Sequence, residues 1–294
     1  MVAGFRRSLS LPCDDDDDEA SRPRHARSSS VPFPSHPAIS HLHHLISVLR
    51  FWPSGGERAP PGERVAAVLL DVARLHAALD DLLHLPLARD PLRRPASPAW
   101  ADRILDDFLR LADAYGSFRS AVLALEQLHS EVRSAIRRRE TGRLASALRA
   151  HRRVEKDLAR LAAAVRDLAG KAATPLTWMS SGEVDVARVL REAVTETATA
   201  SAFVFAAVVA VSAEASTAAG STTGSSGSSS VVGTVLRKLW KRGADAEAEV
   251  VALERLKAAE ELMGGLMETG ISERVFRSLM NTRVSLLNIL TPSL

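Results

Sequence analysis

Residues 272–290, SERVFRSLMNTRVSLLNIL, decide the fold class that this sequence predicts. At about 100° per residue, most of their apolar side chains fall on one broad face of a helix. These side chains are Val275, Phe276, Leu279, Met280, Val284, Leu286, Leu287 and Leu290. A face this wide is not stable in water, because the burial of apolar surface is what drives folding. The stretch therefore predicts a final helix that other helices must cover.

Arg283 lies in the middle of this apolar face. A buried guanidinium without partners is costly, and it cannot lose its proton. We expect Arg283 to meet a carboxylate or several carbonyls, or to reach an edge of the bundle. Asp80 is the first candidate partner, in a structural ion pair, and Asp107 is the second. The alternative is an exposed helix end on which Arg283 is solvated.

The composition of the 294-residue chain favours helices. Ala and Leu are abundant, aromatic residues make up 4%, and strand-forming residues never alternate over a useful length. The net charge of +3 is too small to imply a nucleic-acid partner. The single cysteine, Cys13, excludes an intramolecular disulfide. Together these features predict an all-α cytoplasmic protein.

Two domains are predicted. Residues 1–37 are rich in Ser, Pro, Arg and Asp without apolar periodicity, which predicts a disordered tail. Residues 38–294 are predicted to form a helical bundle domain. The helical pattern of residues 98–140 would be about 60 Å long at 1.5 Å per residue, which predicts an elongated multi-helix bundle. Residues 216–230, a Ser/Thr/Gly tract, are predicted to be a flexible linker within it.

The pattern R-S-x-S-x-P occurs twice in the tail, at residues 7–12 and 27–32. In each copy a serine, Ser10 or Ser30, follows an Arg by three residues, the spacing on which basic-directed kinases dock. A phosphoserine followed by Pro suits an Arg-lined groove of the 14-3-3 type. We expect both serines to be phosphorylated and to bind such a protein partner. The alternative is a chance match in a Ser/Arg-rich tail.

Residues 130–160 carry ten basic residues and four acidic residues. They are predicted to form a basic hairpin of helices. Its basic patch consists of Arg137, Arg138, Arg139, Arg152 and Arg153. The patch is predicted to be the solvated side of the hairpin, with anionic membrane binding as the alternative. Aromatic residues do not interleave with the cations, which argues against nucleic acid.

Residues 198–213, ATASAFVFAAVVAVSA, form an uncharged run. A membrane-spanning helix needs about 20 apolar residues, and this run is shorter and is diluted by Thr and Ser. A fully buried core helix is therefore the preferred interpretation, and membrane association through this helix is the alternative.

No catalytic or metal-ligating residue is predicted, and no cofactor. The sequence contains no phosphate-binding glycine loop, no zinc-protease motif and no nucleophile elbow. Asp80 and Asp81 are adjacent on a helix, so their carboxylates diverge by about 100° and cannot act on one substrate atom. His41 and His44 could share a helix face, but a zinc ion would need further ligands that are absent nearby in the sequence.

Several motifs occur together in this chain: RSLSLP and RSSSVPFPSHP in the tail, DDLLHLP at 80–86, WADRILDDFLRLADAYG at 100–116, TVLRKLWKRG at 234–243 and FRSLMNTRVSLLNIL at 276–290. In combination they resemble the plant-specific BYPASS-related family, from about residue 28 to the C-terminal end. The resemblance implies a helical, non-enzymatic protein of root and shoot development, in a family whose founding member restrains a root-derived mobile signal. The acidic run at 14–18 and the length of the Ser/Gly tract depart from the family pattern.

The leading functional hypothesis is a regulatory or interaction protein that acts through bundle contacts and a phosphorylatable tail. The alternative is a membrane-associated protein, anchored by residues 198–213 or by the basic hairpin at 130–160. The sequence does not determine the oligomeric state.

Overall fold

The structure, a computed structural model, describes residues 36–52, 60–93, 99–172, 181–222 and 234–291. Within these residues it contains eight α-helices and no strands, which confirms the predicted all-α class. The helices are α1 (Pro37–Phe51), α2 (Pro61–His84), α3 (Pro86–Leu92), α4 (Ala99–Arg138), α5 (Thr141–Ala172), α6 (Ser181–Ser221), α7 (Thr234–Glu268) and α8 (Ile271–Leu290). All of them lie in one compact unit, Phe33–Leu294.

Proline sets the starts of three helices. Pro37, Pro61 and Pro86 each occupy the first helical position, where the missing N–H costs no hydrogen bond. Leu85, which precedes Pro86, is extended with φ −79° and ψ 141°, because proline disfavours the helical conformation of the residue before it. This one extended residue separates α2 from α3.

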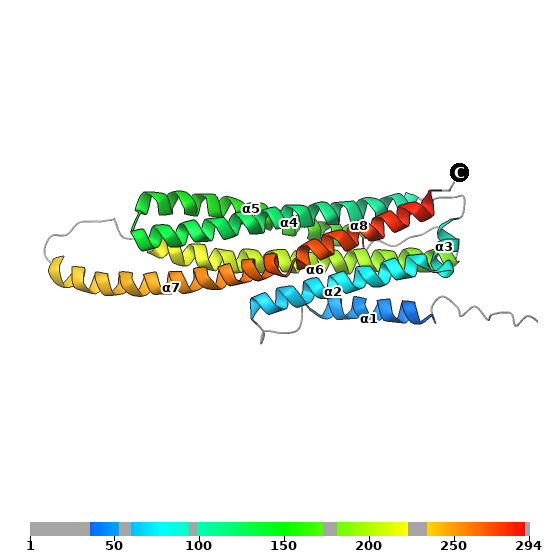
Figure 1. Ribbon diagram of the computed structural model, residues 1–294, viewed down its shortest axis with the longest axis horizontal. Helices are drawn as coiled ribbons and strands as arrows, with labels where there is room; N and C mark the ends of the chain where they lie inside the picture. Colours follow the sequence, from blue (N-terminus) through cyan, green and yellow to red (C-terminus); the bar gives the residue numbers. More distant parts are fainter. Residues whose placement is uncertain (1–35, 53–59, 94–98, 173–180, 223–233, 292–294) are drawn as a thin grey trace, which may run out of the picture. The chain divides into compact units, whose positions relative to one another are not determined.

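The central element of the bundle is α6. It packs against α1, α2, α3, α4, α5 and α7, and Figure 1 shows it running alongside the long helices. The uncharged run at 198–213 lies inside α6, where Ala198, Val204, Phe205 and Val208 are fully buried. The predicted core helix is therefore packed among the other helices.

By length and composition alone, α6 also has the character of a membrane span. Its segment Asp185–Ser221 has a mean hydropathy of 1.7 in its most apolar window, and 56% of that window is buried inside the protein. A core helix of a soluble protein has the same character, so length and composition do not distinguish the two.

The C-terminal helix α8 packs mainly on α2 and α4, with smaller contacts to α3 and α7. Its buried stripe is narrower than the sequence predicts. Val275, Leu279, Leu286 and Ile289 are buried at helical spacing, whereas Val284 is 47% exposed. Only two helices cover α8 extensively, so the edges of its apolar arc stay partly open.

The end of α6 corrects the prediction of a linker that begins at residue 216. Residues 216–221 are helical. Ala215 and Ala219 are fully buried in a small apolar cluster with α4, α5 and α7, and Ser216 Oγ donates to Glu155 Oε1 at 3.1 Å. These tertiary contacts outweigh the weak helix propensity of the Ser/Thr-rich sequence. Residues 223–230 of the predicted linker lie outside the described part of the chain.

Two helical hairpins turn through the same backbone conformation with different residues. Gly270, between α7 and α8, and Arg139, between α4 and α5, both have φ 57°. At the second turn the N–H of Glu140 bonds to Ala135 O and the N–H of Arg139 to Ile136 O, both at 3.0 Å, which is the pattern of a Schellman cap. Glycine adopts this conformation freely, whereas an L residue with a side chain pays about 1 kcal/mol or more.

Arg139→Gly should therefore raise the free energy of unfolding by about 0.5–1 kcal/mol, measured in thermal melts. The matched control is Arg138→Gly, which removes the same charge one residue earlier, inside α4. That variant should lose up to about 1 kcal/mol, because glycine is a poor helix former. Equal effects of the two substitutions would contradict the assignment of strain to Arg139.

Candidate interaction surface

One face of α5 is exposed and basic. The helix packs against α4 and α6 through its apolar residues, and its opposite face is in contact with solvent. Four exposed cations recur on that face at spacings of three, one and three residues, which places them on one side of the helix. We call them the basic stripe: Arg149, Arg152, Arg153 and Lys156.

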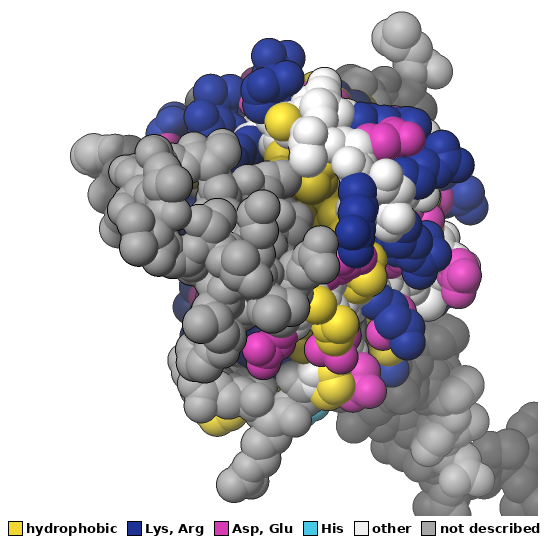
Figure 2. Space-filling model, turned by 90° about the vertical axis from the view of Figure 1, so that its left-hand side faces the viewer, with side chains coloured by type: hydrophobic (Ala, Val, Ile, Leu, Met, Phe, Trp, Pro, Cys, Tyr) yellow, Lys and Arg dark blue, Asp and Glu magenta, His cyan; other side chains and the backbone are white. Residues whose placement is uncertain are grey.

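Three further exposed cations, Arg137, Arg138 and Arg139, lie at the turn that leads into α5 and are called here the turn arginines. The five residues of the predicted basic patch are thus all exposed at the α4–α5 hairpin, and Arg149 and Lys156 extend the surface that they form. Figure 2, which views this end of the bundle, shows Lys and Arg side chains gathered around its upper and right-hand parts.

Other cations of the hairpin have acidic partners. Arg133 pairs with Glu260 at 2.6 Å, Arg160 with Asp157 at 2.7 Å, and Arg143 lies 3.5 Å from Glu140. Among the described residues, no carboxylate lies within 4.0 Å of the basic stripe or the turn arginines. The hairpin therefore carries a cluster of exposed cations that form no close ion pair with the described part of the chain.

The polar side chains of the core form two clusters that the sequence analysis did not identify. The first surrounds His76 of α2, which is fully buried. Its Nε2 lies 3.0 Å from Thr197 Oγ1 of α6, its Nδ1 lies 3.5 Å from Thr282 Oγ1 of α8, and its ring meets the Phe108 ring edge-on. Burial lowers the pKa of His76 to about 3, so the imidazole is neutral. In the sequence, His76 follows Val72 by four residues and precedes Leu79 by three, which places it on the apolar face of α2. This spacing could have predicted that His76 is buried.

The second cluster joins α4, α5 and α6. Ser212 Oγ lies 3.4 Å from His129 Nε2 and 3.2 Å from His151 Nε2, and the two imidazole rings are 4.7 Å apart. His151 Nδ1 lies 3.1 Å from Glu155 Oε1, although without hydrogen-bond geometry. Burial, and secondarily the neighbouring His151, lowers the pKa of His129 to about 3.

A hydroxyl, an imidazole and a carboxylate in this order resemble the nucleophile, base and orienting group of a hydrolase. Here Ser212 and His151 are fully buried between helices, so the Ser212 hydroxyl has no path to a substrate in this conformation. The cluster instead places polar groups inside the core, where Ser212 Oγ lies near both imidazoles while His129 Nδ1 and His151 Nδ1 have no hydrogen-bond partner.

The predicted ion pair of Arg283 and Asp80 is not formed. Arg283 is half-buried, and its Nε donates to the Leu105 carbonyl at 3.3 Å, whereas Asp80 Oδ1 accepts from Ser285 Oγ at 2.5 Å. Asp107, the second candidate, is also not paired with Arg283, and burial raises its pKa. Because α8 is only partly covered, the guanidinium meets one carbonyl and solvent and does not need a carboxylate.

The predicted phosphorylation sites, Ser10 and Ser30, lie outside the described residues.

In the part of the chain that the structure describes, no group of three or more His, Cys, Asp or Glu side chains is placed to hold a metal ion.

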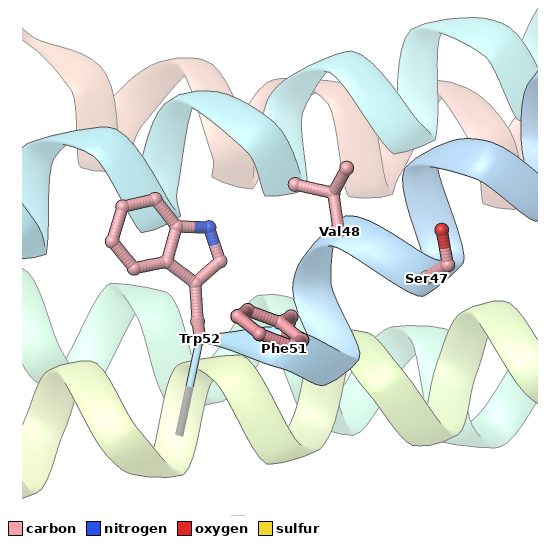
Figure 3. A pocket seen from close by; sticks show the side chains of 4 residues that line it. All are labelled: Ser47, Val48, Phe51 and Trp52. Atoms are coloured by element: carbon pink, nitrogen blue, oxygen red, sulfur yellow. The ribbon is translucent and has the colours of Figure 1, made fainter. Parts of the chain in front are cut away.

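A hollow of about 500 Å³ opens at the end of α1. Ser47, Val48, Phe51 and Trp52 line it, and Figure 3 shows these four side chains along one side of the helix. The Phe51 side chain is 71% exposed, and Trp52 Nε1 donates to Asp71 Oδ2 at 3.0 Å. The described residues that line the hollow are mainly apolar and offer a surface for hydrophobic contact.

A protein-family model described as Protein BPS1 matches residues 69–289. The matched region runs from α2 to α8 and includes the basic hairpin and both buried histidine clusters. No curated protein and no solved structure matches the chain.

Proposed function

Because the chain belongs to the BYPASS-related family described as Protein BPS1, we propose that it is a non-enzymatic regulatory protein of plant root and shoot system development. The observation that carries the proposal is the family match, which covers most of the chain. Removing the protein from its plant should alter root and shoot growth, and the full-length chain should restore it. Normal growth of both organs in its absence would contradict the proposal.

The proposed mode of action is contact with protein partners through the surface of the helical bundle. The imidazoles and hydroxyls of the two histidine clusters are buried between helices, while cations without a close acidic partner lie on the described surface. A charged surface of this kind can steer the encounter with a partner of complementary charge and add specificity to it. Proximity labelling in root tissue would identify those partners.

The tail is proposed to regulate these contacts in the cytoplasm through phosphorylation of Ser10 and Ser30. A phosphate adds nearly two negative charges and three acceptor oxygens, which an Arg-lined groove can bind. The double variant Ser10→Ala, Ser30→Ala should lose capture of a 14-3-3-type protein from cell extract. The matched control, Ser8→Ala, Ser28→Ala, changes the neighbouring serine of each motif and should keep it. Equal capture by both double variants would refute a role for the two serines.

A further inference from the structure

We propose that the outer face of α5, formed by the basic stripe with the turn arginines, binds the surface of a membrane that contains anionic lipids. This inference goes beyond the proposed function, which concerns development and protein partners, and neither depends on the other.

The first support is the placement of α5 at the outside of the bundle. Its buried side is taken up by α4 and α6, and these two contacts leave the opposite side free. The basic stripe spans about 10 Å of this side at 1.5 Å per residue, and the turn arginines extend the charge beyond the start of the helix. A flat surface can therefore meet several of these cations at once.

The second support is that, in the described part of the chain, the cations of the stripe and turn form no close ion pairs. Glu155 is the acidic residue closest in sequence to the centre of the stripe, but its side chain is only 12% exposed and accepts from Ser216 inside the bundle. Asp157 is engaged by Arg160, and Glu140 lies beside Arg143. Within the described residues, none of the seven cations of the stripe and turn has a carboxylate within 4.0 Å, and Arg137 feels a nearby acid, Glu260, whose pKa its charge acts to lower.

The third support is the chemistry of the surface, which suits lipid headgroups better than RNA. Neither α5 nor the turn before it contains Phe, Tyr or Trp, so no ring is available on which a base could stack. Anionic lipids diffuse within the leaflet and can collect under a row of cations without a shaped pocket. Each Lys or Arg near such a surface contributes about fivefold to binding.

The test is co-sedimentation of the purified full-length chain with vesicles. The chain should pellet with phosphatidylcholine vesicles that contain about one third phosphatidylserine, and remain in the supernatant with phosphatidylcholine alone. Neutralising the stripe with Arg149→Gln, Arg152→Gln, Arg153→Gln and Lys156→Gln should weaken binding by about 100-fold or more. Raising the salt concentration to about 1 M should release the wild-type chain, because salt screens surface charge.

The matched control neutralises four other exposed cations, Arg93, Arg103, Arg166 and Arg274, and should retain most of the binding. Both variants should keep the helical content and melting temperature of the wild type. No pelleting of the wild type, equal loss in both variants, or pelleting that resists high salt would overturn the proposal. Tighter binding of a single-stranded RNA than of the vesicles, lost in the stripe variant, would overturn it in favour of nucleic acid.

Discussion

Lowering the pH from 7.5 to 4 should reduce the free energy of unfolding by several kcal/mol, because two buried histidines must stay neutral in the folded protein. The pKa of His76 and that of His129 are both lowered to about 3, whereas an unfolded chain binds these protons near pH 6.5. Between pH 6.5 and 3 the unfolded state therefore binds more protons, so stability falls as the pH falls. At pH 4 each histidine should cost about 3 kcal/mol.

The groups around the two imidazoles do not offset this cost. His76 faces the hydroxyls of Thr197 and Thr282, and His129 faces His151 and Ser212. Glu155 borders the second cluster through His151, not through His129. Other carboxyls act in the opposite direction: burial raises the pKa of Asp107 and that of Glu260, so their protonation favours the folded state. The contribution of each histidine must therefore be measured by difference.

The measurement is urea unfolding of the wild type and His76→Gln at pH 7.5 and pH 4, followed by circular dichroism. The variant should be less stable at pH 7.5, because the packing around His76 is disturbed, but its loss between the two pH values should be smaller by about 3 kcal/mol. His43→Gln, which replaces an exposed histidine of α1, should show the wild-type loss. An unchanged pH dependence in His76→Gln would rule out the buried imidazole as its origin.

Phe205→Ala should be the most damaging single truncation of the α4–α6 contact, with a loss of about 3–5 kcal/mol in the free energy of unfolding. The Phe205 ring is fully buried and lies parallel to the Phe118 ring, with centroids 4.4 Å apart. The Tyr115 ring meets it edge-on at 5.5 Å, and the Tyr115 hydroxyl lies 2.8 Å from Ser201 Oγ. Removing Phe205 leaves a cavity at the centre of the bundle and takes away both ring contacts.

The matched control is Phe51→Ala, the same substitution on a ring that is 71% exposed at the end of α1. It should change stability by less than about 0.5 kcal/mol, because a solvent-exposed side chain leaves no cavity behind. Chemical unfolding of both variants at pH 7.5 makes the comparison. Similar losses in the two would mean that the aromatic cluster does not stabilise the core.

The local features of this protein could be predicted from the sequence, because they repeat at the period of a single helix. The apolar faces, the uncharged core run at 198–213 and the exposure of Arg152 and Arg153 all follow from the 3.6-residue periodicity. Pro86 marked the end of α2, since proline disfavours a helical residue before it. Gly270 marked the turn before α8 for a different reason: glycine adopts the positive φ of such a turn, here 57°, without steric cost.

Which helices and which side chains contact one another was decided only by the tertiary structure. The sequence drew attention to α8, but α6 is the helix that most of the others contact, because it passes between α5 on one side and α2 on the other. Asp80 meets Ser285 and not the predicted Arg283, although these two residues are only two positions apart on α8. A periodic pattern places a side chain on a face of its own helix, whereas the residue opposite depends on the axial position at which two helices pack.

Helix packing also decides which of the charged side chains form ion pairs. The sequence shows where the cations of residues 130–160 lie, but not which of them are neutralised. Arg133 is paired because α7 brings Glu260 to it, a carboxylate 127 residues away along the chain. The basic stripe has no carboxylate within 4.0 Å among the described residues, because α5 packs mainly against α4 and α6 through the side opposite the stripe. Local periodicity therefore determined which side chains are exposed, and long-range helix packing determined which of the exposed charges are free.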